Sequence, residues 1–172
     1  VGIYLAVCGN VLFHPHELND DALNRLEECL GLEMHPLSIG GSTLVGALVA
    51  GTSKGLAVAD IATDSDIDSL TSFGDVVVME GGVNTAGNLI LCNENGAIAS
   101  PSIPEDGVEI ISEILGVPIA VSSIAGESVV GSLGVANDQG VLLHPDVLPD
   151  EVSLIEEILG VPPMVGTVSF GS

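Results

Sequence analysis

Two ten-residue stretches decide the fold: GNLILCNENG at Gly87–Gly96 and GSLGVANDQG at Gly131–Gly140. They lie 44 residues apart, and the same offset aligns Leu115–Pro118 with Leu159–Pro162. Self-similarity at a fixed period is typical of repeat architectures, in which each unit packs against its neighbours. The chain is therefore predicted to consist of repeats of one small supersecondary unit.

The same register extends into the N-terminal half of the chain. Gly46 and Gly55 are nine residues apart, as are Gly87 and Gly96. The alignment divides the sequence into four repeats within a single repeat domain, at residues 1–44, 45–85, 86–129 and 130–172. We therefore expect four copies of one α/β unit.

Each repeat is predicted to run strand, turn, strand, helix, strand. The turn residues of Asn93–Gly96 and Asn137–Gly140 lie between apolar runs, which is typical of β-hairpins. The strands before these turns are predicted at Leu89–Cys92 and Leu133–Ala136. An apolar stripe at helical spacing follows, and it ends at a glycine, Gly116 or Gly160. No unit can bury its apolar face alone, so neighbouring units must pack against each other.

The first two units carry weaker forms of this helix. In the first, Asn19 is a predicted N-cap and Gly31 the stop, and the apolar stripe consists of Ala22, Leu23, Leu26 and Leu30. In the second, only Asp64–Leu70 remains as a short helix. The core is predicted to be aliphatic, because the chain has three phenylalanines, one tyrosine and no tryptophan.

The charge balance excludes several classes of partner. The chain has 24 Asp and Glu residues against Lys54 and Arg25, and its formal net charge is −22. Such a surface repels phosphate, which excludes non-specific nucleic-acid binding and docking to an anionic membrane. The longest uncharged stretch, His35–Ser53, contains a proline and four glycines, so no membrane span is predicted.

The cysteines do not predict a disulfide frame or a zinc site. Cys8, Cys29 and Cys92 are odd in number and lack CxxC spacing. We expect all three to be small buried hydrophobic residues in a reducing, cytoplasmic environment. Because each lies in a predicted strand or helix, no nucleophilic thiol is expected.

Three other motifs suggest chemistry but have simpler interpretations. Asp64–Asp68 resembles the start of a calcium loop, but a serine stands where the loop needs glycine, so a helix N-terminus is favoured. Gly40–Thr43 resembles a phosphate loop without its lysine, and an inter-unit turn is favoured. A metal site at His14 and His16 would lack a third ligand. No repeated acid or nucleophile accompanies the histidines that recur at His14 and His144, so a catalytic base is not favoured. We predict no metal, no cofactor and no catalytic residue.

Four further stretches are informative together: Ser38–Gly46 (SIGGSTLVG), Asn84–Asn88 (NTAGN), Val135–Pro145 (VANDQGVLLHP) and Glu156–Pro162 (EEILGVP). In this order they resemble archaeal and eukaryotic translation initiation factor six, over essentially the whole chain. The resemblance implies an α/β fold of the pentein type, a β/α propeller of pseudo-symmetric repeats with strands inside and helices outside.

The resemblance also implies a function. Family members are non-catalytic factors that bind the large ribosomal subunit, chiefly through a basic ribosomal protein, and prevent premature association with the small subunit. Related factors serve late large-subunit maturation. The expectation is a cytoplasmic protein, monomeric when free, with little direct nucleic-acid contact. Its acidity suits a basic protein partner, and it also suits a cytosol of high salt, where charges are screened.

Family contact positions cluster just after the Val-Gly that opens units. Thr52 replaces an asparagine that the fourth unit retains in its turn. The predicted ribosome-binding positions in this sequence are Ala47, Asn88, Ser132, Leu133 and Asn137.

The chain departs from the family in length. Family members have five units and a further strand before the first Val-Gly, and the fifth repeat and that first strand are missing from this sequence. We expect an incomplete chain, because an open ring leaves exposed strand edges; a genuine four-unit form is the alternative. Two other functions stay open. One is a pentein hydrolase acting on guanidino compounds, in which Cys92 is the last available thiol, and the other is a repeat scaffold with neither activity.

Overall fold

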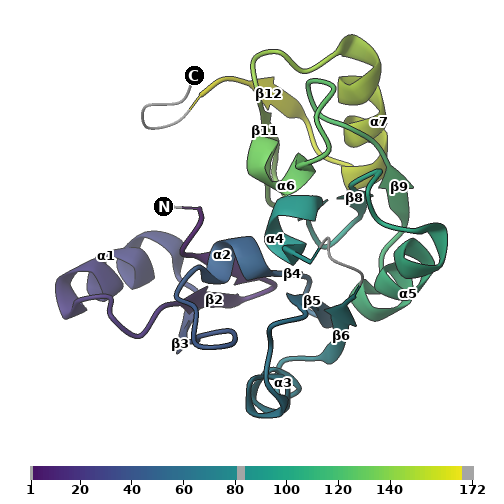
Figure 1. Ribbon diagram of the computed structural model, residues 1–172. Helices are drawn as coiled ribbons and strands as arrows, with labels where there is room; N and C mark the ends of the chain where they lie inside the picture. The colour runs from purple at the N-terminus through teal and green to yellow at the C-terminus, as the bar shows by residue number, and fades with distance from the viewer. Residues whose placement is uncertain (1, 81–83, 168–172) are drawn as a thin grey trace.

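The computed structural model describes residues 2–80 and 84–167. Val1 and residues 168–172, which belong to the predicted first and last repeats, lie outside the described residues, as do residues 81–83. Four three-stranded sheets follow one another in an arc, with the longer helices on its outside (Figure 1). The prediction of a mixed α/β fold built from four repeated units is confirmed, while the repeat boundaries stay a prediction.

The helices and strands have the following bounds. The first unit contains β1 (Ala6–Cys8), β2 (Val11–His14), α1 (Asp20–Leu30) and β3 (Glu33–Pro36). The second contains α2 (Val45–Leu48), β4 (Val49–Gly51), β5 (Gly55–Ala59), α3 (Asp64–Leu70) and β6 (Asp75–Met79). The third contains α4 (Ala86–Leu89), β7 (Ile90–Cys92), β8 (Ala97–Ala99), α5 (Glu105–Leu115) and β9 (Ile119–Val121). The fourth contains α6 (Val130–Leu133), β10 (Gly134–Ala136), β11 (Val141–Leu143), α7 (Pro149–Leu159) and β12 (Pro163–Val165).

All four sheets have the same topology. The middle strand pairs antiparallel with the first strand and parallel with the last. A parallel pair needs a crossover, and the outer helices α1, α3, α5 and α7 provide it. Within residues 2–80 and 84–167, no helix has the length and apolarity to span a membrane.

A four-residue helix precedes the first strand of the second, third and fourth units, which corrects the predicted order of elements. The sequence predicts strands from Leu89 and Leu133, but these residues end α4 and α6. Such short apolar runs do not distinguish a strand from a helical turn. The decisive feature is the glycine at the second position of each short helix.

These glycines bring the short helices together at the centre of the arc. A Cβ atom on Gly46 would lie 1.9 Å from the carbonyl oxygen of Gly2, and one on Gly87 would lie 2.0 Å from that of Gly46. One on Gly131 would lie 2.1 Å from the carbonyl oxygen of Gly87. Each glycine therefore contacts the equivalent glycine of the preceding unit, and we call this series the glycine ladder. It leaves no room for a side chain.

The outer helices begin and end as predicted. Asn19 caps α1, and its Oδ1 accepts the Ala22 N–H at 2.8 Å. The outer helices α5 and α7 end at Gly116 and Gly160, whose φ values of 64° and 63° lie in the left-handed region that favours glycine.

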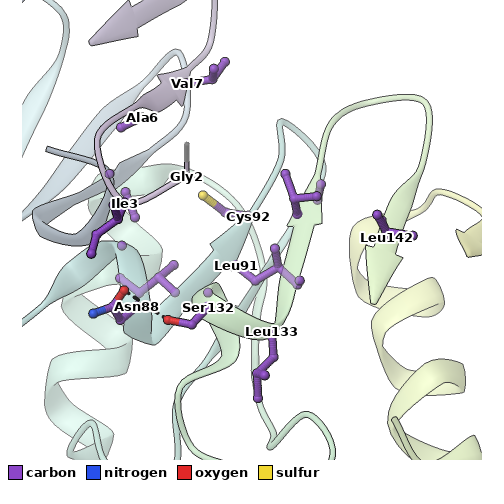
Figure 2. Close-up of a pocket in the computed structure, with 18 of the residues that line it drawn as sticks. Gly2, Ile3, Ala6, Val7, Asn88, Leu91, Cys92, Ser132, Leu133 and Leu142 are labelled. Atoms are coloured by element: carbon purple, nitrogen blue, oxygen red, sulfur yellow. Dashed lines mark hydrogen bonds between the residues drawn. The ribbon is translucent and has the colours of Figure 1, made fainter. Parts of the chain in front are cut away.

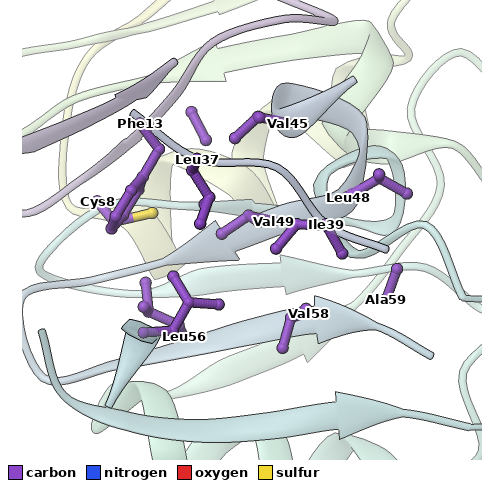
Figure 3. Packing of buried hydrophobic residues seen from close by; sticks show 12 residues of the cluster. Cys8, Phe13, Leu37, Ile39, Val45, Leu48, Val49, Leu56, Val58 and Ala59 are labelled. Atoms are coloured by element: carbon purple, nitrogen blue, oxygen red, sulfur yellow. The ribbon is translucent and has the colours of Figure 1, made fainter. Parts of the chain in front are cut away.

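The hydrophobic core is divided into three clusters, and each lies between two neighbouring units. The first cluster joins Cys8 and Phe13 of the first unit to Val49 and Leu56 of the second (Figure 3). This arrangement confirms that units pack against each other rather than burying a core alone. The prediction of a purely aliphatic core is wrong at one place, because the rings of Phe13 and Phe73 meet edge to face with centroids 5.1 Å apart.

The first outer helix differs from the later ones in burial. The helices α5 and α7 pack against strands of the preceding unit, β5 and β8 respectively. The helix α1 has no preceding unit to cover in the described chain, and none of its residues is buried. Leu30, which belongs to the predicted apolar stripe, is 49% exposed. Its predicted burial is therefore wrong.

Candidate functional site

The outer helices give the arc two distinct faces. The helix-start face contains the first turns of α1, α3, α5 and α7, the short helices α2, α4 and α6, and the linker hairpins at residues 39–42 and 124–127. The turn face contains the hairpin turns at residues 52–55, 93–96 and 137–140 and the last turns of the outer helices.

Hydrogen bonds establish which segments share a face. The Gly40 N–H donates to Asp66 Oδ2 at 2.8 Å, which joins the first linker hairpin to the start of α3. On the turn face, the Thr52 hydroxyl donates to the carbonyl oxygen of Leu115 at 2.7 Å, at the end of α5. The bond from Gly40 and the bridge between Ile39 and Ser42 show that Gly40–Thr43 is an inter-unit turn, as predicted.

Three predicted binding positions are equivalent residues of consecutive short helices. Ala47 on α2 is buried, Asn88 on α4 is half-buried and Ser132 on α6 is exposed. The Ser132 hydroxyl donates to Asn88 Oδ1 at 3.0 Å, and the half-buried Leu133 follows on the same helix (Figure 2). The structure therefore brings Asn88, Ser132 and Leu133 together on the helix-start face, whereas the Ala47 side chain is packed inside.

The fifth predicted position, Asn137, lies on the turn face and is not brought together with the other four. Its Oδ1 accepts the N–H groups of Gln139 and Gly140 at 2.9 and 3.0 Å, so it stabilises its own turn. The equivalent Asn93 is buried, and its Nδ2 also donates to the carbonyl of Leu159 in the next unit at 2.9 Å. This position thus has a structural role, and docking by Asn137 stays a prediction.

Carboxylates gather on the helix-start face. The first turns of the outer helices contain Asp20, Asp21, Asp64, Asp66, Glu105, Asp106, Asp150 and Glu151. The two basic residues of the sequence lie elsewhere. Arg25 is in the middle of α1, and Lys54 is on the turn face, where its Nζ donates to the Gly116 carbonyl at 2.8 Å. No lysine or arginine therefore offsets the charge of the helix-start face.

Two of these carboxylates do more than the sequence indicated. Asp66 lies in the segment for which the sequence predicts a helix N-terminus, and Glu151 lies in the first turn of α7. In the structure, both also accept hydrogen bonds from the linker hairpin that precedes their unit's short helix. The one available signal was positional, because each is the third residue of its outer helix.

A cavity of about 760 Å³ opens at the centre of the arc (Figure 2). Glycines and aliphatic residues from all four units line it, together with Asn88, Cys92, Ser132, His144 and Thr167. None of the residues that line it in the described part of the chain is an aspartate or glutamate. Recognition of a guanidinium depends on carboxylates, so this cavity lacks the chemistry that the hydrolase alternative requires.

The three thiols differ in exposure. Cys8 is buried and Cys92 is half-buried, but Cys29 on α1 is exposed, which corrects the expectation that all three are buried. Burial raises the pKa of Cys92 to about 12 and raises the pKa of Cys8 well above its usual value. The Cys92 thiol also donates to the Gly51 carbonyl at 3.3 Å. A protonated, hydrogen-bonded thiol is a poor nucleophile.

Thiol reactivity should therefore separate the three cysteines. At pH 8 under native conditions, we expect iodoacetamide to modify Cys29 rapidly and to leave Cys8 and Cys92 intact, because the thiolate is the reactive form and a raised pKa keeps the thiol protonated. Intact mass should show one label natively and three in denaturant. Rapid native labelling of Cys92 would contradict this assignment and favour the hydrolase alternative.

The candidate metal-binding motifs have structural roles. His14 is buried, and its Nδ1 lies 2.9 Å from the carbonyl oxygen of Pro15. The Asp64–Asp68 segment starts α3, where Thr63 and Asp66 form a capping box. In residues 2–80 and 84–167, no three His, Cys, Asp or Glu side chains are grouped closely enough to hold a metal ion.

The fold and its ladder of central glycines define a repeat α/β protein. A profile of the eIF-6 family matches residues 1–172. Translation initiation factor 6 of Methanothermobacter thermautotrophicus is 39% identical over 130 residues, which are 75% of this chain and 59% of that protein. The same factor of Picrophilus torridus is 33% identical over 127 residues, 73% of this chain and 58% of the relative.

A further relative, Translation initiation factor 6 of Halorubrum lacusprofundi, is 32% identical over 121 residues, 69% of this chain and 55% of the relative. The chain spans less than 60% of the length of the curated relatives that it matches. The chain belongs to the eIF-6 family, which confirms the resemblance drawn from the sequence.

Proposed function

We propose that this chain is a non-catalytic translation factor that binds the large ribosomal subunit in the cytoplasm and prevents premature association with the small subunit. Its membership of the eIF-6 family and the names of its relatives support a role in translation initiation. The same docking would serve late maturation of the large subunit. The proposed docking surface is the helix-start face, centred on Asn88, Ser132 and Leu133.

The observation that carries this proposal is the charge of the helix-start face. Six of the eight residues with a carboxylate in the first turns of the outer helices are exposed, while Asp66 is half-buried and Glu151 is buried. Both basic residues of the sequence lie away from this face. Such a surface attracts a basic protein and repels the phosphates of RNA. We therefore propose contact through a basic ribosomal protein, with little direct nucleic-acid contact.

We also propose that the arc is part of a closed pentein-type propeller, with the strands around its centre. Repetition of one contact from unit to unit supports this proposal, because the Gly46, Gly87 and Gly131 contacts all have nearly the same geometry. A constant step between equivalent units generates a ring when its rotation closes.

The hydrolase alternative has less support. The Cys92 pKa of about 12 and the absence of carboxylates among the described lining residues of the central cavity both oppose it. An enzyme that acts on guanidino compounds would need an activated thiol and an anionic subsite.

Sedimentation of ribosomal subunits tests the proposed function. We expect the chain to comigrate with the large subunit and to lower the fraction of joined ribosomes when small subunits are added. Binding should weaken as salt rises, because the attraction between an acidic face and a basic protein is screened. Unchanged joining without comigration would overturn the proposal.

A matched pair of double variants tests the docking face. Asp20→Asn with Asp21→Asn removes two exposed carboxylates at the start of α1, and Glu27→Gln with Glu28→Gln removes two at its other end. We expect the first pair to slow association with the large subunit about threefold or more and the second to change it little. Equal effects would place the docking surface elsewhere.

A further inference from the structure

The carboxylate of Glu151 uses both of its oxygens to hold neighbouring segments. Its Oε1 accepts the Ser123 hydroxyl at 2.6 Å and the Gly126 N–H at 3.2 Å. Its Oε2 accepts the Ala125 N–H at 2.7 Å and the Leu148 N–H at 2.9 Å. Only 7% of the residue is exposed. We call Glu151 with these four partners the Glu151 clamp; it joins the second linker hairpin to the start of α7.

The clamp holds a residue in an unfavourable backbone conformation. Ala125 has a φ of 56°, and in residues 2–80 and 84–167 it is the one residue other than glycine with a positive φ. The equivalent position of the first linker hairpin is Gly40, with a φ of 57°. An alanine avoids this conformation unless its surroundings impose it. The hydrogen bond from Ala125 to Glu151 is such a constraint.

A second carboxylate repeats the arrangement. Asp66 Oδ2 accepts the Gly40 N–H at 2.8 Å and the Thr63 N–H at 2.9 Å, and so joins the first linker hairpin to the start of α3. Asp66 and Glu151 are both the third residue of their outer helices, and the third unit has Gly107 at this position. The same contact therefore occurs in two of the four units, at equivalent positions of their outer helices.

The clamped hairpin leads directly into the candidate docking surface. Ile124 and Glu127 close the hairpin with two backbone hydrogen bonds of 3.1 and 3.0 Å. Three residues after Glu127 the chain enters α6, which carries Ser132 and Leu133. The position of the hairpin therefore determines where α6 begins.

We propose that Glu151 is a positioning residue of the docking face: by clamping the linker hairpin at residues 124–127, it sets the position in which α6 presents Ser132 and Leu133 to the ribosomal partner. Asp66 has the same role for the hairpin at residues 39–42 and α2. The part of this inference that concerns the partner rests on the proposed function, whereas the clamp itself does not.

The protonation state of Glu151 agrees with this role. Burial alone would raise the pKa of Glu151, but the hydrogen bonds from Ser123, Leu148, Gly126 and Ala125 outweigh burial, and the pKa lies below its usual value. The carboxylate is therefore ionised at neutral pH. The stabilisation by the clamp is complete above the usual glutamate pKa and is lost as the pH falls through the lowered one.

Substitution of Glu151 by glutamine tests the proposal. Each carboxylate oxygen accepts two hydrogen bonds, so either orientation of the amide would place its NH2 group against two donors. We expect the amides of Ala125 and Gly126 to exchange hydrogen about tenfold faster or more, while exchange in β11 stays unchanged. The dissociation constant for the large subunit should rise about threefold or more, because fewer molecules hold α6 in the competent position.

Two further variants make the result specific. Glu156→Gln removes the same charge from an exposed position on the same helix, and it should change neither the exchange of Ala125 nor the binding. Ala125→Gly relieves the unfavourable φ, so adding it to Glu151→Gln should restore part of the lost protection and binding. Rescue of this kind is not expected if Glu151 merely stabilises α7.

The outcomes separate the two proposals. Unchanged exchange at Ala125 and Gly126 in Glu151→Gln, or faster exchange in step with β11, would overturn the clamp. Faster local exchange with the same dissociation constant as Glu156→Gln would overturn its role in docking. Failure of the wild-type chain to bind the large subunit would instead overturn the proposed function, and the exchange comparison would then decide the clamp by itself.

Discussion

Replacement of Gly87 by alanine is expected to prevent native packing of the units. The new Cβ would lie 2.0 Å from the carbonyl oxygen of Gly46 and 2.9 Å from that of Val49. Both are backbone atoms, so relief requires a shift of α2 and β4 against the rest of the arc. We expect a loss of about 4 kcal/mol or more in the free energy of unfolding, measured by urea denaturation. A loss of this size is comparable to the whole stability of many small domains.

Gly107 provides the control for loss of a glycine as such. It lies within α5, and a Cβ there would meet its nearest atom, in the Ile103 side chain, at 3.3 Å. Because alanine is the better helix former, we expect Gly107→Ala to be neutral or to stabilise the chain by up to about 1 kcal/mol. If Gly87→Ala and Gly107→Ala unfolded at the same urea concentration, the glycine ladder would not constrain the packing.

The second large effect is expected for Asn93→Ala. The Asn93 side chain accepts the N–H groups of Asn95 and Gly96, both at 3.0 Å, and donates to the carbonyls of Asn137 and Leu159 at 3.1 and 2.9 Å. Alanine removes all four bonds and leaves polar groups of two units without this partner. We expect a loss of about 3 kcal/mol in the free energy of unfolding, because unpaired buried groups carry the larger part of the cost.

Asn137 is the matched control, because it occupies the same position in the fourth unit. It is exposed, and its Oδ1 accepts the N–H groups of Gln139 and Gly140. Asn137→Ala should therefore cost about 1 kcal/mol. Equal losses for the two variants would show that the bonds of Asn93 to the next unit contribute nothing.

Much of the fold is predictable from signals that lie within one unit. Turn residues followed by a glycine predict the hairpins at residues 93–96 and 137–140, which the structure confirms. The N-cap Asn19 and the stop Gly31 predict α1, and the structure confirms both. Each of these signals depends on residues that are neighbours in the sequence.

Features that depend on a neighbouring unit are not predictable in this way. Leu30 belongs to the predicted apolar stripe and Cys29 is predicted to be buried, but both are exposed, because α1 has no preceding sheet to cover within residues 2–80 and 84–167. The short helix α4 has an apolar sequence that also suits a strand, and contact with the preceding glycine requires the helical turn. Here tertiary contact overrides a local pattern.

In the candidate site, too, some features are predictable from the sequence and others depend on contacts between units. The family resemblance predicted Asn88, Ser132 and Leu133 together, and the repeat explains why equivalent residues of successive units are adjacent. No local signal connects Glu151 with Ala125, because the two residues are 26 positions apart and no regular pattern joins them. A buried carboxylate with its donors appears only in the folded chain.

The division of the core into three shared clusters makes the stability of this protein a property of junctions. Among residues 2–80 and 84–167, these clusters connect the first unit to the fourth through the two units between them. A substitution at one junction is expected to act first on the two units that share it and on the others through them, and structure can nucleate at any adjacent pair and spread from there.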